Sequence, residues 1–194
     1  VFMVSADGGP LIDATPDVTG CMIGTWSADG NFIYYSKDFN LLKLELSSNE
    51  STLVANGSWI GQESTDGKTL YHSNIVIGSS GGWLLYEKPT DNLDPYDLGK
   101  LVHEDIKMQM PQTFYTRENK LFWLGWDEND TQKIDKPLMT MDPDSGDPLQ
   151  ISVIRNLPDL YHNIDLSVGG TQALIPRQPK AESDIMIFKH PPLR

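Results

Sequence analysis

The chain has 194 residues, one cysteine, and 15 Lys and Arg against 27 Asp and Glu, which gives a formal net charge of −12 at pH 7. This charge disfavours a nucleic-acid surface and docking on an anionic membrane, because both need clustered Lys and Arg. The lone Cys21 cannot close an intrachain disulfide, and the four histidines do not have metal-ligand spacing. We therefore expect no metal site and no cofactor, with Cys21 as a small buried residue at the start of a strand.

Short strands and turns follow one another from the first residue. Two strands are expected within residues 1–14. Residues 26–36 then predict a hairpin, in which Asp29-Gly30 supplies the tight turn before a strand rich in aromatic residues. A third strand is expected over 40–46, and the polar residues 47–49 mark the next turn.

This hairpin recurs along the chain. Residues 63–73 repeat its Ser-x-Asp-Gly turn, and residues 115–124 and 166–175 carry degenerate copies, the first with Glu118-Asn119 at the turn. Each copy is followed by a further apolar strand, over 83–86, 137–141 and 184–188. No segment has the 3.6-residue period of an amphipathic helix, so helix should be minor.

Four antiparallel strands in each unit of about 40 to 50 residues are typical of a β-propeller blade. We predict an all-β chain, a β-propeller of four-stranded antiparallel blades with about four to five blades present, as part of a larger or incomplete ring. The whole chain, 1–194, would be a single propeller domain or a fragment of one. Its parts would be residues 1–20 as the end of a preceding blade, 21–57, 58–109 and 110–157 as blades, and 158–194 as the final blade. A β-sandwich is the alternative, but it has no reason to repeat this turn at blade spacing.

Residues 78–82 spell the G-x-S-x-G pattern of a nucleophile elbow around Ser80. An elbow needs a helix directly after the serine, whereas the next residues, 83–86, read as a strand. The pattern therefore predicts a glycine-rich hairpin loop, and we expect no catalytic residues and no enzymatic activity.

Two segments are acidic and turn-forming, and the first of them, residues 142–147, resembles the start of a calcium loop. Residues 142–147 lack the glutamate that a calcium loop carries at its twelfth position, where Val153 stands. They are expected to form a solvated turn. Asp127–Asp130 is also expected to be a solvent loop, with a weak divalent-cation site as the alternative.

The aromatic residues have two expected roles. Trp26, Tyr34, Tyr71 and Trp123, on the hairpins, are expected to pack between blades. Trp83 and Trp126 lie beside loops and are the candidates for ligand stacking. The sequence does not identify the ligand-binding residues.

The repeat Ser-x-Asp-Gly-x-x-Leu/Ile-Tyr-x-Ser resembles the TolB-type, WD40-like propeller repeat, with Ala28 and Thr65 at the usual proline. Residues 161–167, followed by 181–188, resemble the closing blade of certain bacterial sensor proteins. In these proteins a TolB-like propeller is fused behind a winged-helix DNA-binding domain of the CadC or ToxR kind, or behind a protein kinase.

This resemblance implies a non-enzymatic sensing or protein-interaction propeller in a bacterial membrane-spanning transcriptional regulator. It implies a periplasmic location and an unknown protein partner or small-molecule signal, with a homodimer as one arrangement. The domain itself would bind no nucleic acid, and it would meet the membrane only through an upstream span. The alternatives are the substrate-gating propeller of a prolyl-oligopeptidase-like hydrolase and a TolB-like periplasmic interaction protein.

Overall fold

The computed structural model describes residues 2–3, 10, 12–15, 22–75, 82–107, 114–125, 135–155, 165–166, 172–177 and 184–189. Every regular element in these residues is a β-strand, and the described part of the chain holds no helix that could cross a membrane. The chain divides into two compact units, one of residues 1–79 with 84–104 and one of 80–83 with 105–194.

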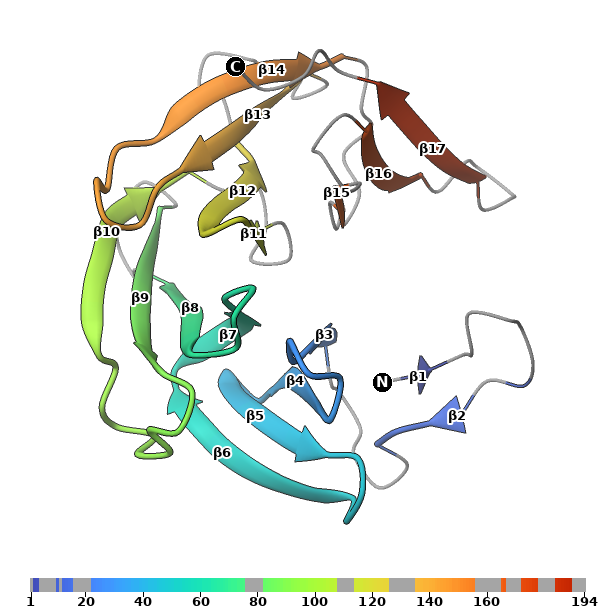
Figure 1. Cartoon of the computed structure of the whole chain (residues 1–194), viewed down its shortest axis with the longest axis vertical. Helices are drawn as coiled ribbons and strands as arrows, with labels where there is room; N and C mark the ends of the chain where they lie inside the picture. The colour runs from blue at the N-terminus through green and yellow to red at the C-terminus, as the bar shows by residue number, and fades with distance from the viewer. Residues whose placement is uncertain are drawn as a thin grey trace. The chain divides into compact units, whose positions relative to one another are not determined.

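Two four-stranded antiparallel sheets make up most of the first unit (Figure 1). The first sheet contains β3 (Met22–Trp26), β4 (Phe32–Lys37), β5 (Asn40–Glu45) and β6 (Glu50–Asn56). The second contains β7 (Ser58–Glu63), β8 (Thr69–Ile75), β9 (Trp83–Pro89) and β10 (Lys100–Ile106). A separate pair, β1 (Phe2–Met3) with β2 (Ile12–Asp13), precedes them. Strands that follow one another in sequence are neighbours in each sheet.

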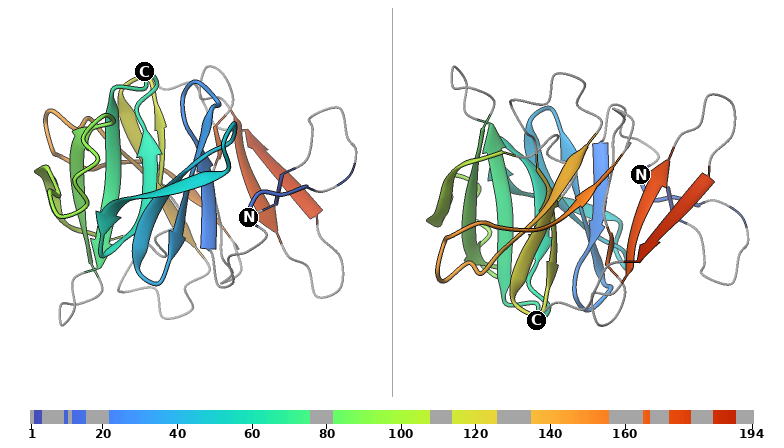
Figure 2. Two further views of the ribbon diagram at one scale, coloured as in Figure 1. Left: turned by 90° about the horizontal axis from the view of Figure 1, so that it is seen from below. Right: turned by 90° about the horizontal axis from the view of Figure 1, so that it is seen from above.

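The second unit repeats this plan. One sheet contains β11 (Phe114–Arg117), β12 (Lys120–Leu124), β13 (Lys136–Met141) and β14 (Leu149–Ile154). The last contains β15 (Asp165–Leu166), β16 (Gln172–Arg177) and β17 (Asp184–Lys189), and Figure 2 shows β16 and β17 side by side. These sheets confirm the predicted all-β fold of four-stranded antiparallel blades. Assignment of residues 1–194 to one domain stays a prediction.

Strand β4 explains why each blade needs neighbours on both sides. Its residues alternate between the two faces of the sheet, as the two-residue period of a strand requires. Tyr34 belongs to a buried cluster that includes Leu70 of the second sheet. Ile33 and Tyr35 belong to a cluster on the other face that includes Ala14. Both faces of the sheet are therefore buried. The burial of apolar side chains on the two faces is the main contribution to the stability of the sheet.

The hairpin turns have the backbone geometry that the sequence predicts. Gly30 and Gly67 adopt φ values of +74° and +71°, in the region where a side chain is strained. Glu118 and Asn119, at the turn between β11 and β12, also have positive φ values, of 47° and 60°. Such a pair of left-handed residues matches the twist of a two-residue hairpin.

The loop between β9 and β10, residues 90–99, is called the strap below. The buried ammonium of Lys88 donates hydrogen bonds to the carbonyls of Val54 (2.6 Å), Asp94 (2.9 Å) and Asp97 (3.2 Å). The main-chain N–H of Asn56 donates to the carbonyl of Pro95 (2.8 Å). Strand β6 is the edge of its sheet, and two of its main-chain groups that would otherwise be open to another strand are satisfied, one by the strap and one by Lys88 of β9.

The first prediction concerns Lys88, whose side chain is buried although it carries a charge. Replacing it in Lys88→Met leaves its three carbonyl partners without a donor, two of them in the strap. We expect the free energy of unfolding to fall by about 2 to 4 kcal/mol in urea titrations. Lys68→Met is the control, because the Lys68 side chain is 82% exposed and should change stability by less than about 0.5 kcal/mol. Equal effects of the two substitutions would contradict the role of Lys88.

Candidate functional site

The turn between β3 and β4 is closed by the side chains of its own repeat motif. The hydroxyl of Ser27 donates to Oδ1 of Asp29 (2.7 Å), and the N–H of Phe32 donates to Oγ of Ser27 (2.9 Å). Asp29 Oδ1 also accepts from the N–H of Asn31 (3.0 Å). Each polar group of the motif therefore has a partner within the turn, which fixes the direction in which the carboxylate points.

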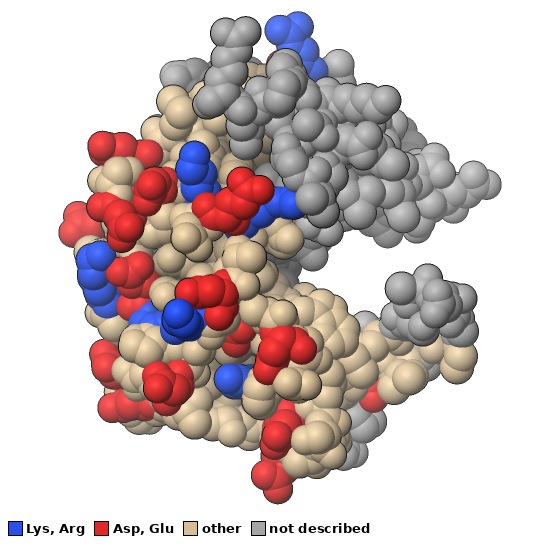
Figure 3. Space-filling model, viewed as in Figure 1, with Lys and Arg blue, Asp and Glu red and all other residues tan. Residues whose placement is uncertain are grey.

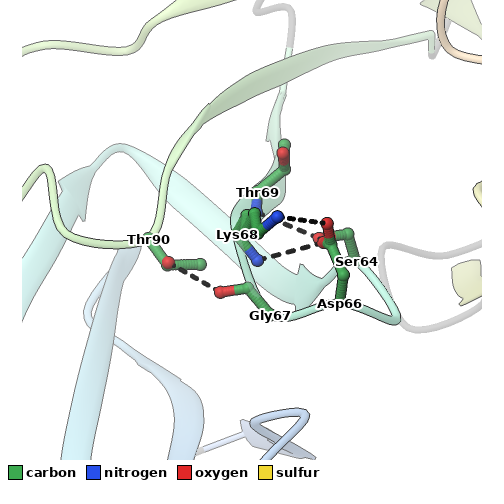
Figure 4. A network of polar contacts seen from close by, with 6 residues as sticks. All are labelled: Ser64, Asp66, Gly67, Lys68, Thr69 and Thr90. Carbon is green, nitrogen blue, oxygen red and sulfur yellow. Dashed lines mark hydrogen bonds and ion pairs between the residues drawn. The ribbon is translucent and has the colours of Figure 1, made fainter.

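The turn between β7 and β8 repeats these contacts (Figure 4). Ser64 donates to Oδ1 of Asp66 (2.7 Å), and the N–H of Thr69 donates to Oγ of Ser64 (3.0 Å). The hydroxyl of Thr90, at the start of the strap, donates to the carbonyl of Gly67 (2.8 Å). The strap is thus bonded to this turn as well as to β6.

The two turn carboxylates are held in their ionised form. The N–H of Asn31, followed by the hydroxyl of Ser27, lowers the pKa of Asp29 below its usual value of 3.8. The hydroxyl of Ser64 and the N–H of Lys68 lower the pKa of Asp66 in the same way. Hydrogen bonds donated to a carboxylate favour its charged form, so both groups are negative at neutral pH.

Glu63, the last residue of β7, joins the second sheet to the first. Its side chain is buried, with Oε1 accepting from the hydroxyl of Tyr34 (2.6 Å) and Oε2 accepting from the N–H of Ala28 (2.8 Å). Burial and the adjacent Glu63 carboxylate raise the pKa of Tyr34, so the phenol remains a donor. The same contacts place both turns beside each other.

A cavity of about 510 Å³, called the turn pocket below, lies between these two turns within the first unit. Besides the turns it is lined by Phe32, Lys43, Glu63, Thr90 and Asp91. The ammonium of Lys43 lies 4.0 Å from the centroid of the Phe32 ring, in cation–π contact.

The lining of the turn pocket carries more acidic than basic side chains, although the ammonium of Lys68 lies 3.7 Å from Oδ2 of Asp66. Four of its lining residues, Asp29, Glu63, Asp66 and Asp91, are acidic, against one lysine. Opposite charges are attracted most strongly where the protein partly excludes water. In the described part of the chain, neither histidine nor cysteine lines this pocket. Its side chains supply electrostatic attraction and hydrogen bonds.

The sequence analysis predicted the positions of both turns but assigned them only a role in folding. It did not predict a site role for Glu63 at the end of β7, for Lys43 of β5 or for the strap residues Thr90 and Asp91. One signal was present, since Glu63 stands at the repeat position that Trp26 holds in the first copy. A buried carboxylate in one copy and an indole in the other indicate that this position contacts different surroundings.

The aromatic residues follow the predictions in part. Tyr34, Tyr71 and Trp123 are buried, as expected. The prediction for Trp26 is wrong, because its side chain is 51% exposed: the described residues that pack beside the first sheet, such as Ala14, contact Ile33 and Tyr35 instead. Trp83 is only 7% exposed, so its ring is not available for ligand stacking.

Of the remaining predicted site residues and acidic segments, the structure describes only residues 142–147. Cys21, Ser80, Trp126 and Asp127–Asp130 lie outside the described residues. Within residues 142–147 the carbonyl of Asp142 accepts from the main-chain N–H groups of Ser145 and Gly146, which forms an exposed turn. The described residues contain no group of three or more His, Cys, Asp and Glu side chains that could hold a metal ion.

A serine–histidine contact that the sequence did not predict lies inside the second sheet. Oγ of Ser58 is 2.8 Å from Nδ1 of His72, and Nε2–H of His72 donates to the carbonyl of Leu98 in the strap (3.0 Å). Because a carbonyl only accepts, Nε2 carries a proton, and the hydroxyl of Ser58 donates to Oδ1 of Asn74. Both side chains have 0% exposure, so the pair is closed to a substrate and supports the strap.

Comparisons with known proteins identify the fold. No family model matches the sequence, and a search of curated proteins finds no significant match. Among solved structures, TolB from Acinetobacter baumannii has a TM-score of 0.61 at 13% identity, over 97% of this chain and 45% of that one. A TolB protein from Agrobacterium tumefaciens has a TM-score of 0.55 at 15% identity, over 87% of this chain and 58% of that one.

A peptidase has the same fold in part. Acylaminoacyl peptidase from Pyrococcus horikoshii has a TM-score of 0.52 at 10% identity, over 94% of this chain and 32% of that one. The chain therefore spans 58% and 45% of the two TolB chains and about a third of the peptidase. At these identities the likeness concerns architecture alone, and the architecture is the β-propeller fold that the two TolB structures share.

The second prediction tests the bridge made by Glu63. Glu63→Gln keeps one acceptor oxygen and turns an NH2 group toward the other donor, so one buried hydrogen bond is lost. We expect a loss of about 1 to 3 kcal/mol in the free energy of unfolding. Glu50→Gln, at an exposed position of β6, should change it by less than about 0.5 kcal/mol. A double-mutant cycle with Tyr34→Phe should give a coupling energy above about 0.5 kcal/mol, and additive effects would contradict the bridge.

The third prediction concerns the pH dependence of stability. Burial, with a smaller contribution from the charge of Lys88, lowers the pKa of His72 from 6.5 to about 4. The unfolded chain therefore binds a proton at His72 between pH 6.5 and pH 4 that the folded chain does not bind. Stability from this residue is complete above pH 6.5 and is lost as the pH falls toward 4, by roughly 3 kcal/mol.

The measurement is a series of urea titrations between pH 7 and pH 4. His72→Gln keeps a side-chain NH group for the strap carbonyl but cannot titrate, so its unfolding free energy should depend less on pH over this window. The comparison uses the slope with pH, so that a constant loss of stability in the variant does not matter. Equal slopes for the two proteins would contradict the prediction.

Proposed function

We propose that this chain is a non-catalytic propeller part that binds a partner at the turn pocket. The observation that carries the proposal is the pocket itself, where hydrogen bonds within two neighbouring turns keep carboxylates charged and oriented. Such preorganised groups favour binding, because little conformational freedom is lost when a ligand arrives. The serine–histidine pair of the described residues is buried away from this pocket.

For the larger protein we propose a sensing role. The resemblance of residues 161–167 and 181–188 to the closing blade of CadC-like and ToxR-like regulators supports the extracytoplasmic part of a membrane-spanning transcriptional regulator. In that role a ligand or protein partner would favour one arrangement of the propeller, or of its homodimer. This change in population would transmit the signal across the membrane. The acidic charge agrees with a domain that leaves DNA binding to another part of the protein.

A second candidate is the gating propeller of a prolyl-oligopeptidase-like hydrolase. The fold likeness to acylaminoacyl peptidase of Pyrococcus horikoshii is the observation that favours it. A TolB-like periplasmic interaction protein is the third reading and rests on the two TolB structures. The flanking gene sequence separates these candidates. A winged helix and one apolar span would support the sensor, and an α/β-hydrolase domain would refute it.

The fourth prediction is that the chain does not react as a serine hydrolase. We expect no labelling of the 194-residue chain by a fluorophosphonate probe, because an activated serine needs a base about 3 Å away and convergent oxyanion donors. Ser80→Ala should leave the free energy of unfolding unchanged within about 0.5 kcal/mol. Stoichiometric labelling that disappears in Ser80→Ala would overturn the non-catalytic proposal.

A further inference from the structure

The strap has a backbone that is fixed from several directions. Carbonyls of four strap residues, Asp94, Pro95, Asp97 and Leu98, accept hydrogen bonds from Lys88, His72 and the main chain of β6. Within the strap, Asp94 Oδ1 accepts from the N–H of Tyr96 (3.0 Å) and Asp97 Oδ1 accepts from the N–H of Gly99 (2.9 Å). The loop therefore has a defined backbone conformation before any partner binds.

This fixed loop carries two large apolar side chains into solvent. Tyr96 is 77% exposed and Leu93 is 48% exposed. A single exposed apolar residue is ordinary on a protein surface. Tyr96 and Leu93 differ from that case, because they lie on a backbone that buried donors anchor. Binding of a partner there therefore costs little backbone conformational entropy. Tyrosine is also among the residues that contribute most to the affinity of protein interfaces.

The charged side chains around Tyr96 and Leu93 are acidic, which favours a partner of positive charge. Asp91, Asp94 and Asp97 are exposed, and the strap contains neither lysine nor arginine. The N–H of Gly99 and the amide of Asn92 lower the pKa of Asp97, so it stays ionised. Thr90 and Asp91 also line the turn pocket, which joins the strap to the pocket carboxylates. On the face shown in Figure 3, Asp and Glu side chains are spread across the described surface.

We propose that the strap and the turn pocket form one docking surface for a basic segment of a partner protein. A lysine or arginine of that segment would enter the turn pocket, and an apolar side chain would pack against Tyr96 and Leu93. Charge complementarity would steer the encounter, and the apolar contact would set the lifetime of the complex. The inference rests on the proposed function, since it specifies the partner for the same pocket.

The fifth prediction is tested by selection from a displayed library of random dodecapeptides against the whole 194-residue chain. We expect the enriched peptides to combine Lys or Arg with an aromatic or aliphatic residue. Tyr96→Ala should weaken the binding of a synthesised peptide about tenfold, and Asp91→Asn about threefold. The effect of Asp91→Asn should shrink between 50 mM and 500 mM salt, because salt screens exposed charges.

Matched controls separate the surface from general attraction to an acidic protein. Leu149→Ala removes a side chain that is 62% exposed elsewhere, and Glu50→Gln removes one exposed charge, so neither should change binding by more than about twofold. Selected peptides without positive charge, an empty selection, or peptides insensitive to Tyr96→Ala would each overturn the inference. Equal binding of spermidine and peptide, unaffected by Tyr96→Ala, would overturn it in favour of a small cation.

The proposed function can survive that failure. Thr65→Arg places a positive side chain in the turn pocket without changing the strap. Peptides that lose binding in Thr65→Arg but not in Tyr96→Ala would support the pocket and overturn the docking surface. Fluorophosphonate labelling and the flanking gene sequence test the non-catalytic role independently of any peptide.

Discussion

The carboxylate of Glu63 is the contact on which the first unit depends most directly. A propeller blade has two apolar faces, so it is stable only when neighbouring blades cover both of them. Besides the apolar packing, a buried carboxylate accepting from Tyr34 and from Ala28 helps to fix the register of the two sheets. The cost of removing that charge from water is offset only while both donors are in place. The same register brings the turns at Asp29 and Asp66 together and so forms the turn pocket.

The strap covers part of an open sheet edge. Strand β6 ends its sheet, and an open edge would pair with other chains. The strap covers part of this edge through Asn56 and through Lys88, whose ammonium links β6 to the strap. A lysine can do this because one ammonium supplies three donors. The anchoring holds the backbone at Tyr96 and leaves its side chain exposed, so the loop that covers the edge also carries the surface that we propose for a partner.

Folding and binding use the same residues in the turn pocket. Asp29 and Asp66 close their turns by accepting hydrogen bonds, and those bonds also keep their pKa values low. The pocket is therefore negative for the same reason that its turns are tight. The two Ser-x-Asp-Gly turns therefore place acidic groups on the turn side of both sheets, where the two turns lie next to each other.

The sequence by itself determined the strands, the turns and the four-stranded blades. These features depend on residues close together in the chain, such as an Asp-Gly pair or Glu118 and Asn119 at positive φ. Only the tertiary structure decided that Glu63 would meet Tyr34, that Lys88 would reach Val54, and that the predicted packing of Trp26 would fail. Contacts between residues some 30 positions apart depend on how one sheet is rotated against the next. The order of residues within a strand or turn does not determine that rotation.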